Sequence, residues 1–241
     1  MIKIENVDIY GWEATIRGMR NPKNSWDKSD SYFGYDCNSC GRIEKEGFCE
    51  PKKHDCSEYY GIEIGPNDLN LMKTLSNAGT DHGKFLRMIN VTMDITAPLY
   101  WWKEYDTYKV GTVANSCSTM HKIHAKEFTL DDFSHEHLTI YSHDGEICRD
   151  FLGTLEDLID ELNVARELFL ETKDKKYWWQ MIQLLPTSYN QKRTVQVNYQ
   201  VLKAMYNARK NHKLDEWRIF CTWAEELPYF KDIVGDLPEP E

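Results

Sequence analysis

Apolar and polar side chains alternate in one stretch of the chain, and this pattern predicts a β-strand. Over residues 85–95 polar positions separate the apolar ones, which include Ile89, Val91, Met93 and Ile95. Successive side chains of a strand point to opposite faces, so the stretch predicts a strand with one buried face. Pro98 ends this strand, because proline cannot continue the hydrogen-bond ladder. A second, N-terminal strand is predicted over residues 2–10.

A period near 3.6 residues predicts helices elsewhere. The clearest helix is predicted over residues 155–171, whose apolar side carries Leu155, Leu158, Ile159, Leu162, Ala165 and Leu168. Shorter helices are predicted over residues 12–19, 69–78, 99–105, 177–185, 199–208 and 214–227. The order of the elements indicates a mixed α/β (α+β) fold, with few strands and a helix-rich C-terminal half.

Three stretches lack a helical period. Residues 25–60 are rich in Ser, Asp, Gly, Cys and Tyr, which is typical of an irregular insertion. Residues 106–120 are rich in Gly, Ser and Thr and predict a ligand-binding loop, and residues 140–147 predict a hairpin. We therefore expect a single domain over residues 1–241, with a Cys-rich insertion at about 25–62.

Length and net charge limit the classes of protein to which this chain can belong. The 241 residues suit one sizeable domain, and 41% of them are hydrophobic, which is enough for a real core. The net charge of -10 argues against duplex nucleic acid as a partner, although one basic pocket for a mononucleotide remains compatible with it. No apolar run is long enough to span a membrane, and the charged N-terminus is not typical of a signal peptide. We expect a cytoplasmic protein.

Four of the seven cysteines lie close together, namely Cys37, Cys40, Cys49 and Cys56. The spacing of Cys37 and Cys40 suits two thiolates on one metal ion, so the segment predicts a structural zinc site. His54 is an alternative fourth ligand. The other interpretation is a variable loop of reduced thiols that bind no metal.

Two tracts carry further signals. The first begins with Ala97-Pro98 and continues through Lys103-Glu104 and Thr107-Tyr108-Lys109 to a polar series, Thr112, Asn115, Ser116 and Ser118. The second contains Leu185-Pro186, then Asn198 and, eleven positions later, Arg209. Taken in order, these tracts resemble the flavin-dependent thymidylate synthases over roughly residues 65–230.

The match within the first tract is incomplete. The family has Arg-Gln where this chain has Lys103-Glu104, and a basic Arg-His-Arg triplet where it has Thr107-Tyr108-Lys109. Only Lys109 keeps a charge in the triplet. Lys122, Lys126 and Arg193 are the cations that we expect to compensate if a flavin still binds.

The resemblance implies a divergent, phage-type member that acts in the host cytoplasm as a homotetramer with sites formed between subunits. It implies FAD as cofactor, methylenetetrahydrofolate and NADPH as co-substrates, and transfer of a one-carbon unit to C5 of a deoxyuridine monophosphate. Arg209 would polarise the uracil ring and bind substrate together with Asn115, Ser116 and Ser118. The cofactor would contact Lys103, Lys109, Thr112 and Asn198.

Two alternatives stay open. In one, the chain keeps the fold and a pyrimidine-nucleotide site but has lost the flavin chemistry. In the other, the fold analogy is coincidental and the chain is a zinc-stapled interaction protein.

Overall fold

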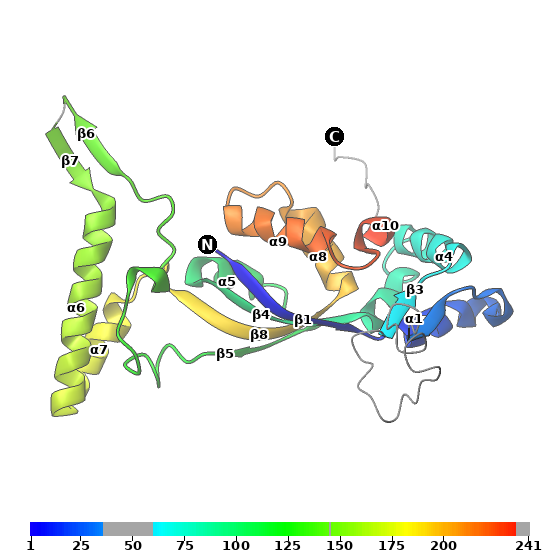
Figure 1. The fold of residues 1–241 in the computed structure, drawn as a ribbon, viewed down its shortest axis with the longest axis horizontal. Helices are drawn as coiled ribbons and strands as arrows, with labels where there is room; N and C mark the ends of the chain where they lie inside the picture. The colour runs from blue at the N-terminus through cyan, green and yellow to red at the C-terminus, as the bar shows by residue number, and fades with distance from the viewer. Residues whose placement is uncertain (36–59, 145, 235–241) are drawn as a thin grey trace, which may run out of the picture. The chain divides into compact units, whose positions relative to one another are not determined.

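The computed structural model describes residues 1–35, 60–144 and 146–234 (Figure 1). The chain forms two compact units. The first unit comprises Met1–Asp8, Val91–Val197 and Met205–Thr222. The second unit comprises Ile9–Asn90, Asn198–Ala204 and Trp223–Glu241. The single domain with an insertion at about 25–62 stays a prediction.

A four-stranded sheet is the centre of the first unit. Its strands follow the order β1-β4-β8-β5 and span β1 Lys3–Tyr10, β4 Asn90–Pro98, β8 Asn190–Asn198 and β5 Thr112–Ser116. Strand β5 is antiparallel to β8, with Thr112 opposite Val197 and Ser116 opposite Arg193. The predicted α/β fold is confirmed.

Strand β4 shows the alternation that the sequence predicts, because Val91, Met93 and Ile95 are buried and the residues between them are half-buried. The predicted start of this strand is wrong. Residues Gly83–Met88 instead form the 3-10 helix η5. Phe85 and Leu86 are both buried, and adjacent side chains cannot share one face of a strand.

The loop predicted over residues 106–120 is also wrong in part, because Thr112–Ser116 forms β5. Four of its five residues are exposed, so the strand lacks the apolar alternation that pattern reasoning needs. Strand β8 was not predicted either. Most of its residues are polar, although three positions near its end are buried, namely Val195, Val197 and Asn198.

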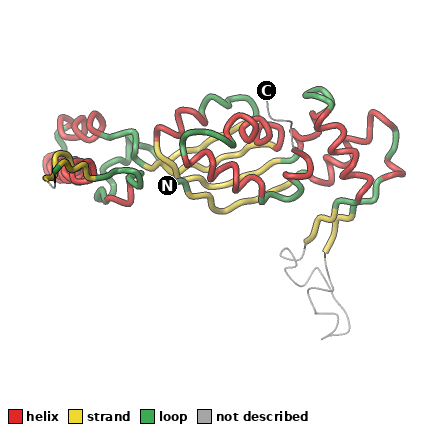
Figure 2. The backbone as a smooth tube through the Cα atoms, turned by 90° about the horizontal axis from the view of Figure 1, so that it is seen from above, coloured by secondary structure: helices red, strands yellow, loops and turns green. Residues whose placement is uncertain are grey.

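Helices cover one face of this sheet (Figures 1 and 2). They are α5 Leu99–Tyr105 and the first-unit parts of α8 Tyr199–Arg209 and α9 Asp215–Glu225. Helix α5 begins directly after Pro98, as predicted, and it buries Trp101, Trp102 and Tyr105. The ring of Trp101 packs against Trp217 on α9, with ring centroids 4.8 Å apart.

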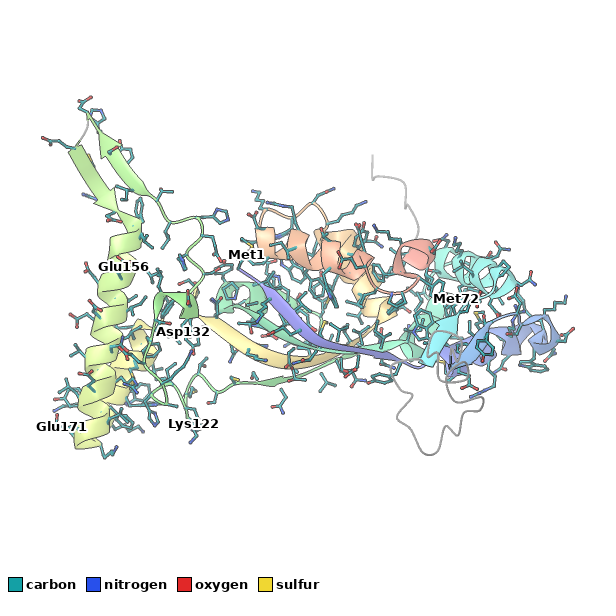
Figure 3. The ribbon with its side chains drawn as sticks, in the orientation of Figure 1. Met1, Met72, Lys122, Asp132, Glu156 and Glu171 are labelled. Atoms are coloured by element: carbon teal, nitrogen blue, oxygen red, sulfur yellow. The ribbon has the colours of Figure 1, made fainter. Side chains whose placement is uncertain are left out.

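A helical hairpin with its own core also belongs to the first unit (Figure 1). Strands β6 Ile140–His143 and β7 Glu146–Asp150 precede helices α6 Phe151–Thr172 and α7 Lys175–Leu184. The long helix begins with a cap, because the Asp150 carboxylate accepts a hydrogen bond from the Gly153 amide at 2.8 Å. Glu156 and Glu171 project from α6 near its two ends (Figure 3). The buried core of this region is Ile123, Phe128, Phe133, Leu155, Ile159, Leu162, Ala165 and Met181.

The second unit is held by a buried ion pair. Helix α1 Trp12–Arg20 ends with Arg20, whose Nε donates to Asp68 Oδ1 on α4 Pro66–Asn77 at 2.6 Å. The other oxygen of Asp68 accepts hydrogen bonds from Ser29, Asp30 and Ser31. Both oxygens of this buried carboxylate are therefore hydrogen-bonded, and the bonds to the second oxygen fix residues 29–31 on α4.

The ends of the predicted irregular segment contain regular structure. The 3-10 helices η1 Asn21–Lys23 and η2 Trp26–Lys28 are followed by β2 Tyr32–Tyr35, which pairs antiparallel with β3 Tyr60–Glu63. The short helix α10 Phe230–Val234 completes the described part of the second unit. Within the described residues, no helix has both the length and the apolarity needed to cross a membrane.

Candidate functional site

Arg209 lies at the end of α8, on the first unit, and two hydrogen bonds fix its guanidinium. Its Nη1 donates to Glu104 Oε2 at 2.8 Å, and its Nε donates to the Tyr108 hydroxyl at 3.2 Å. Both acceptors come from α5 and the turn after it. The side chain of Arg209 keeps 21% of its surface exposed, so it is accessible to a ligand.

Aromatic rings flank the same guanidinium. Its carbon lies 5.1 Å from the ring centroid of Trp217 and 5.9 Å from that of Tyr108. Both distances suit cation–π attraction. Trp217 is fully buried and packs on Trp101, so the wall behind Arg209 is part of the core.

Glu104 accepts hydrogen bonds from the side chains around Arg209. Its Oε2 accepts from Arg209 and from Trp217 Nε1, each at 2.8 Å, and His212 Nε2 lies 3.4 Å from it. The position of one carboxylate oxygen therefore sets the position of three side chains. We call Glu104, Tyr108, Arg209, His212 and Trp217 the Arg209 cluster.

Helix α9 is anchored to α5 by a second carboxylate. The Tyr100 hydroxyl donates to Glu216 Oε1, and Glu216 is buried. Burial and the bond to Glu216 raise the pKa of Tyr100 to about 12, so the phenol keeps its proton at neutral pH. This bond holds the first turn of α9, which also carries Trp217, against α5.

A further cation lies on strand β8. Arg193 stacks on Trp102, with its guanidinium carbon 4.1 Å from the ring centroid, and donates to Asp106 at 2.7 Å and to Gln191 at 2.9 Å. Gln191 in turn donates to the backbone carbonyl of Cys117 at 2.7 Å. Arg193 is therefore committed to protein groups, and so is Lys126, which pairs with Asp132. Lys122 is exposed and forms no ion pair within the described residues.

No protein-family model matches this sequence, and no curated protein matches it. Solved structures do match. Thymidylate Synthase X (ThyX) from Helicobacter pylori, crystallised with FAD and dUMP, has a TM-score of 0.61 at 14% identity over 98% of both chains. A second crystal structure of flavin dependent ThyX from Helicobacter pylori, complexed with FAD and dUMP, has a TM-score of 0.60 at 13% identity and covers 97% of this chain and 98% of that one.

A third match is the UMP/dUMP methylase PolB from Streptomyces cacaoi, bound with 5-Br dUMP. Its TM-score is 0.52 at 13% identity, over 93% of this chain and 91% of that one. This chain has a ThyX-like fold. The interpretation of the fold analogy as a coincidence is therefore wrong.

Some of the predicted site residues form hydrogen bonds within the protein. Thr112 Oγ1 donates to the Tyr108 carbonyl at 2.6 Å, and Ser118 Oγ accepts from the amides of Met120 and His121 at 3.2 and 2.8 Å. In the second unit, Asn198 Oδ1 accepts from the Val201 amide at 3.0 Å and so caps α8. Asn115 and Ser116 lie exposed on β5, and Lys103 and Lys109 are exposed as well.

Sequence reasoning assigned no role to Glu104, His212 or Trp217. Glu104 stands where the thymidylate synthase family has Gln, and this difference was the available signal. The pocket that Arg209 would share with Asn198, Ser116 and Ser118 stays a prediction.

The predicted zinc ligands Cys37, Cys40, Cys49 and Cys56 lie outside the described residues. Among the residues that are described, no group of three His, Cys, Asp or Glu side chains is arranged to hold a metal ion. Cys117 and Cys148 are free and exposed, and Cys221 is buried.

Proposed function

We propose that the Arg209 cluster binds the base of a pyrimidine nucleotide, and that the chain transfers a one-carbon unit to C5 of a deoxyuridine monophosphate. The observation that carries the proposal is the hydrogen bonding of the Arg209 guanidinium. Its Nε and Nη1 are held by Tyr108 and Glu104, whereas its Nη2 makes no hydrogen bond within the described residues. A fixed guanidinium with free donors suits a pyrimidine carbonyl.

Polarisation of that carbonyl is the chemical role that we assign to Arg209. A cation beside the ring carbonyl stabilises the negative charge that the pyrimidine ring carries when C5 acts as the nucleophile, and the C5 proton leaves after C5 has bonded to the carbon electrophile. A guanidinium keeps its charge at any working pH, so no titration is needed. The aromatic wall of Trp217 and Tyr108 excludes water on the protein side and strengthens the interaction.

A bound FAD would supply the redox step, with methylenetetrahydrofolate and NADPH as the carbon and hydride sources. Two cations of this chain suit the FAD pyrophosphate, because Lys103 and Lys109 are exposed and form no ion pair within the described residues. Asn115 and Ser116 on β5 are exposed and suit the nucleotide phosphate. We also propose that the chain acts as a homotetramer in the host cytoplasm.

The experiment starts from the absorption spectrum of the purified protein, in which bound flavin gives a visible band. Release of tritium from C5-labelled dUMP is then followed with methylenetetrahydrofolate, NADPH and added FAD. Arg209→Ala should remove tritium release, and Arg209→Lys should restore little of it, because a lysine lacks the planar donor fork. Arg149→Ala is the matched control, since Arg149 is exposed on β7.

A second candidate function rests on Tyr108. The resemblance implies a basic residue at this position, whereas this chain has Tyr108, whose hydroxyl accepts a hydrogen bond from Arg209. This difference favours a pyrimidine-nucleotide site without flavin chemistry. Binding of dUMP in calorimetry, lost in Arg209→Ala, together with no flavin band and no turnover, would support this candidate. Absence of dUMP binding by the unaltered protein would overturn both.

A further inference from the structure

The second unit contains a cavity of about 800 Å³ that the proposed function does not use. It lies against the end of α1, the 3-10 helices η1 and η5, and Leu75 of α4. Small-molecule sites in proteins have volumes of roughly 300–1,000 Å³, so the cavity has the size of a ligand site.

The floor of this cavity is apolar and rich in sulfur. Met19 and Phe85 are buried there, with 4% and 3% of their surfaces exposed, whereas Met88 is 41% exposed. An exposed methionine beside a buried aromatic ring leaves an adaptable apolar surface. Thioether groups contact aromatic rings favourably, so this floor suits a flat aromatic molecule.

The rim of the cavity is cationic. Its two cations, Lys23 and Lys84, are exposed, and the one acidic residue of the lining is Asp81. Neither lysine forms an ion pair with any of the residues that the structure describes. In contrast, Lys73 of the same unit pairs with Asp232 at 2.8 Å. Two unpaired ammonium groups above an apolar floor attract an anion that carries an apolar body.

We propose that this cavity binds a small aromatic anion, meaning a flat aromatic body that bears one carboxylate, sulfonate or phosphate group. Met19, Phe85 and Met88 enclose the ring, and Lys23 and Lys84 hold the anionic group. The site is independent of the Arg209 cluster, and its ligand need not be a nucleotide.

Two fluorescent probes that differ in one group test the proposal. The first, 8-anilinonaphthalene-1-sulfonate, is an aromatic sulfonate, and the second, N-phenyl-1-naphthylamine, is its neutral counterpart. We expect the native full-length protein to bind one equivalent of the sulfonate at least tenfold more tightly than the neutral probe. Equal affinity for the two probes would overturn the role of the lysines.

Charge reversal locates the binding. The double variant Lys23→Glu, Lys84→Glu should weaken sulfonate binding at least tenfold and leave neutral-probe binding unchanged. The matched control is Lys28→Glu, Lys213→Glu, which reverses two exposed lysines outside the cavity and should bind both probes normally. Both altered lysines are exposed, so the fold should persist, and thermal melting followed by circular dichroism checks this.

A steric variant tests the floor. A Cβ at Gly18 would lie 3.2 Å from Met88 Sδ and 3.7 Å from its Cε, at the end of a side chain that can move. Gly18→Leu therefore places a branched side chain against Met88 in the cavity lining and should weaken binding of both probes at least tenfold. Arg209→Ala should bind the sulfonate as the native protein does. Unchanged sulfonate binding in both the charge-reversal and the Gly18→Leu variants would place the probe elsewhere and overturn the proposal.

Discussion

Removal of the Glu104 carboxylate should destabilise the protein more than removal of Arg209. In Glu104→Ala the buried Trp217 Nε1 loses the acceptor that lies 2.8 Å away. A buried donor without a partner costs about 1–3 kcal/mol. The ion pair with Arg209 adds only about 0–1 kcal/mol, because both side chains are partly exposed. We therefore expect a loss of about 1–4 kcal/mol in the free energy of unfolding.

Arg209→Ala should cost less, about 1 kcal/mol, because Glu104 keeps Trp217 as a donor. Urea denaturation of the two single variants and of the double variant measures the difference and the coupling. Glu156→Ala on the exposed side of α6 is the control and should change little. If Arg209→Ala destabilises as much as Glu104→Ala does, then Glu104 is not the centre of the cluster.

Three further variants test the second unit and the sheet. Gly11→Ala should destabilise by more than about 1 kcal/mol in urea, because Gly11 has φ +98° and a Cβ would lie 2.0 Å from the Met88 carbonyl. Burial raises the pKa of Asp68, but its hydrogen bonds lower it further, to a net value below the ordinary one. The ionised form therefore stabilises the fold above about pH 4, and the deficit of Asp68→Asn should shrink as the pH falls through the folded pKa. Hydrogen bonds from Thr194, Asn6 and Lys192 lower the pKa of Asp94 to about 2. The native protein should therefore lose more stability between about pH 4 and 2 than Asp94→Asn does. An Asn variant that follows the native pH profile, or a Gly11→Ala variant as stable as the native chain, contradicts the reasoning.

Strong periodicity made most helices predictable. The helix α6 has buried residues at Leu155, Ile159, Leu162 and Ala165, and this spacing is visible in the sequence. Proline positions were equally informative, since Pro98 marks the change from β4 to α5. Local patterns sufficed here because each element packs one apolar face against the core.

The sequence pattern does not predict strands β5 and β8, and the reason is physical. The residues Thr112–Ser116 are mostly exposed, so the strand is set by backbone pairing with β8 and not by burial. Long-range pairing of this kind leaves no local period in the sequence. The same holds for the Arg209 cluster, in which Glu104 and Trp217 are 113 positions apart. Sequence spacing suggested Arg209 but gave no sign of the carboxylate that fixes it.

The carboxylate beside Arg209 has two opposing effects on the proposed chemistry. It offsets part of the positive charge that would polarise a pyrimidine carbonyl, and it also fixes the guanidinium, so that no reorganisation is needed when charge develops. An amide at this position, as the family has, would leave the full charge but could not hold Arg209 and Trp217 through one ionised oxygen. The fully buried Trp217 decides between the two effects, because its Nε1 requires an acceptor whether or not a ligand is bound. Glu104 is therefore first a positioning residue, and the proposed nucleotide would meet the Nη2 edge of Arg209.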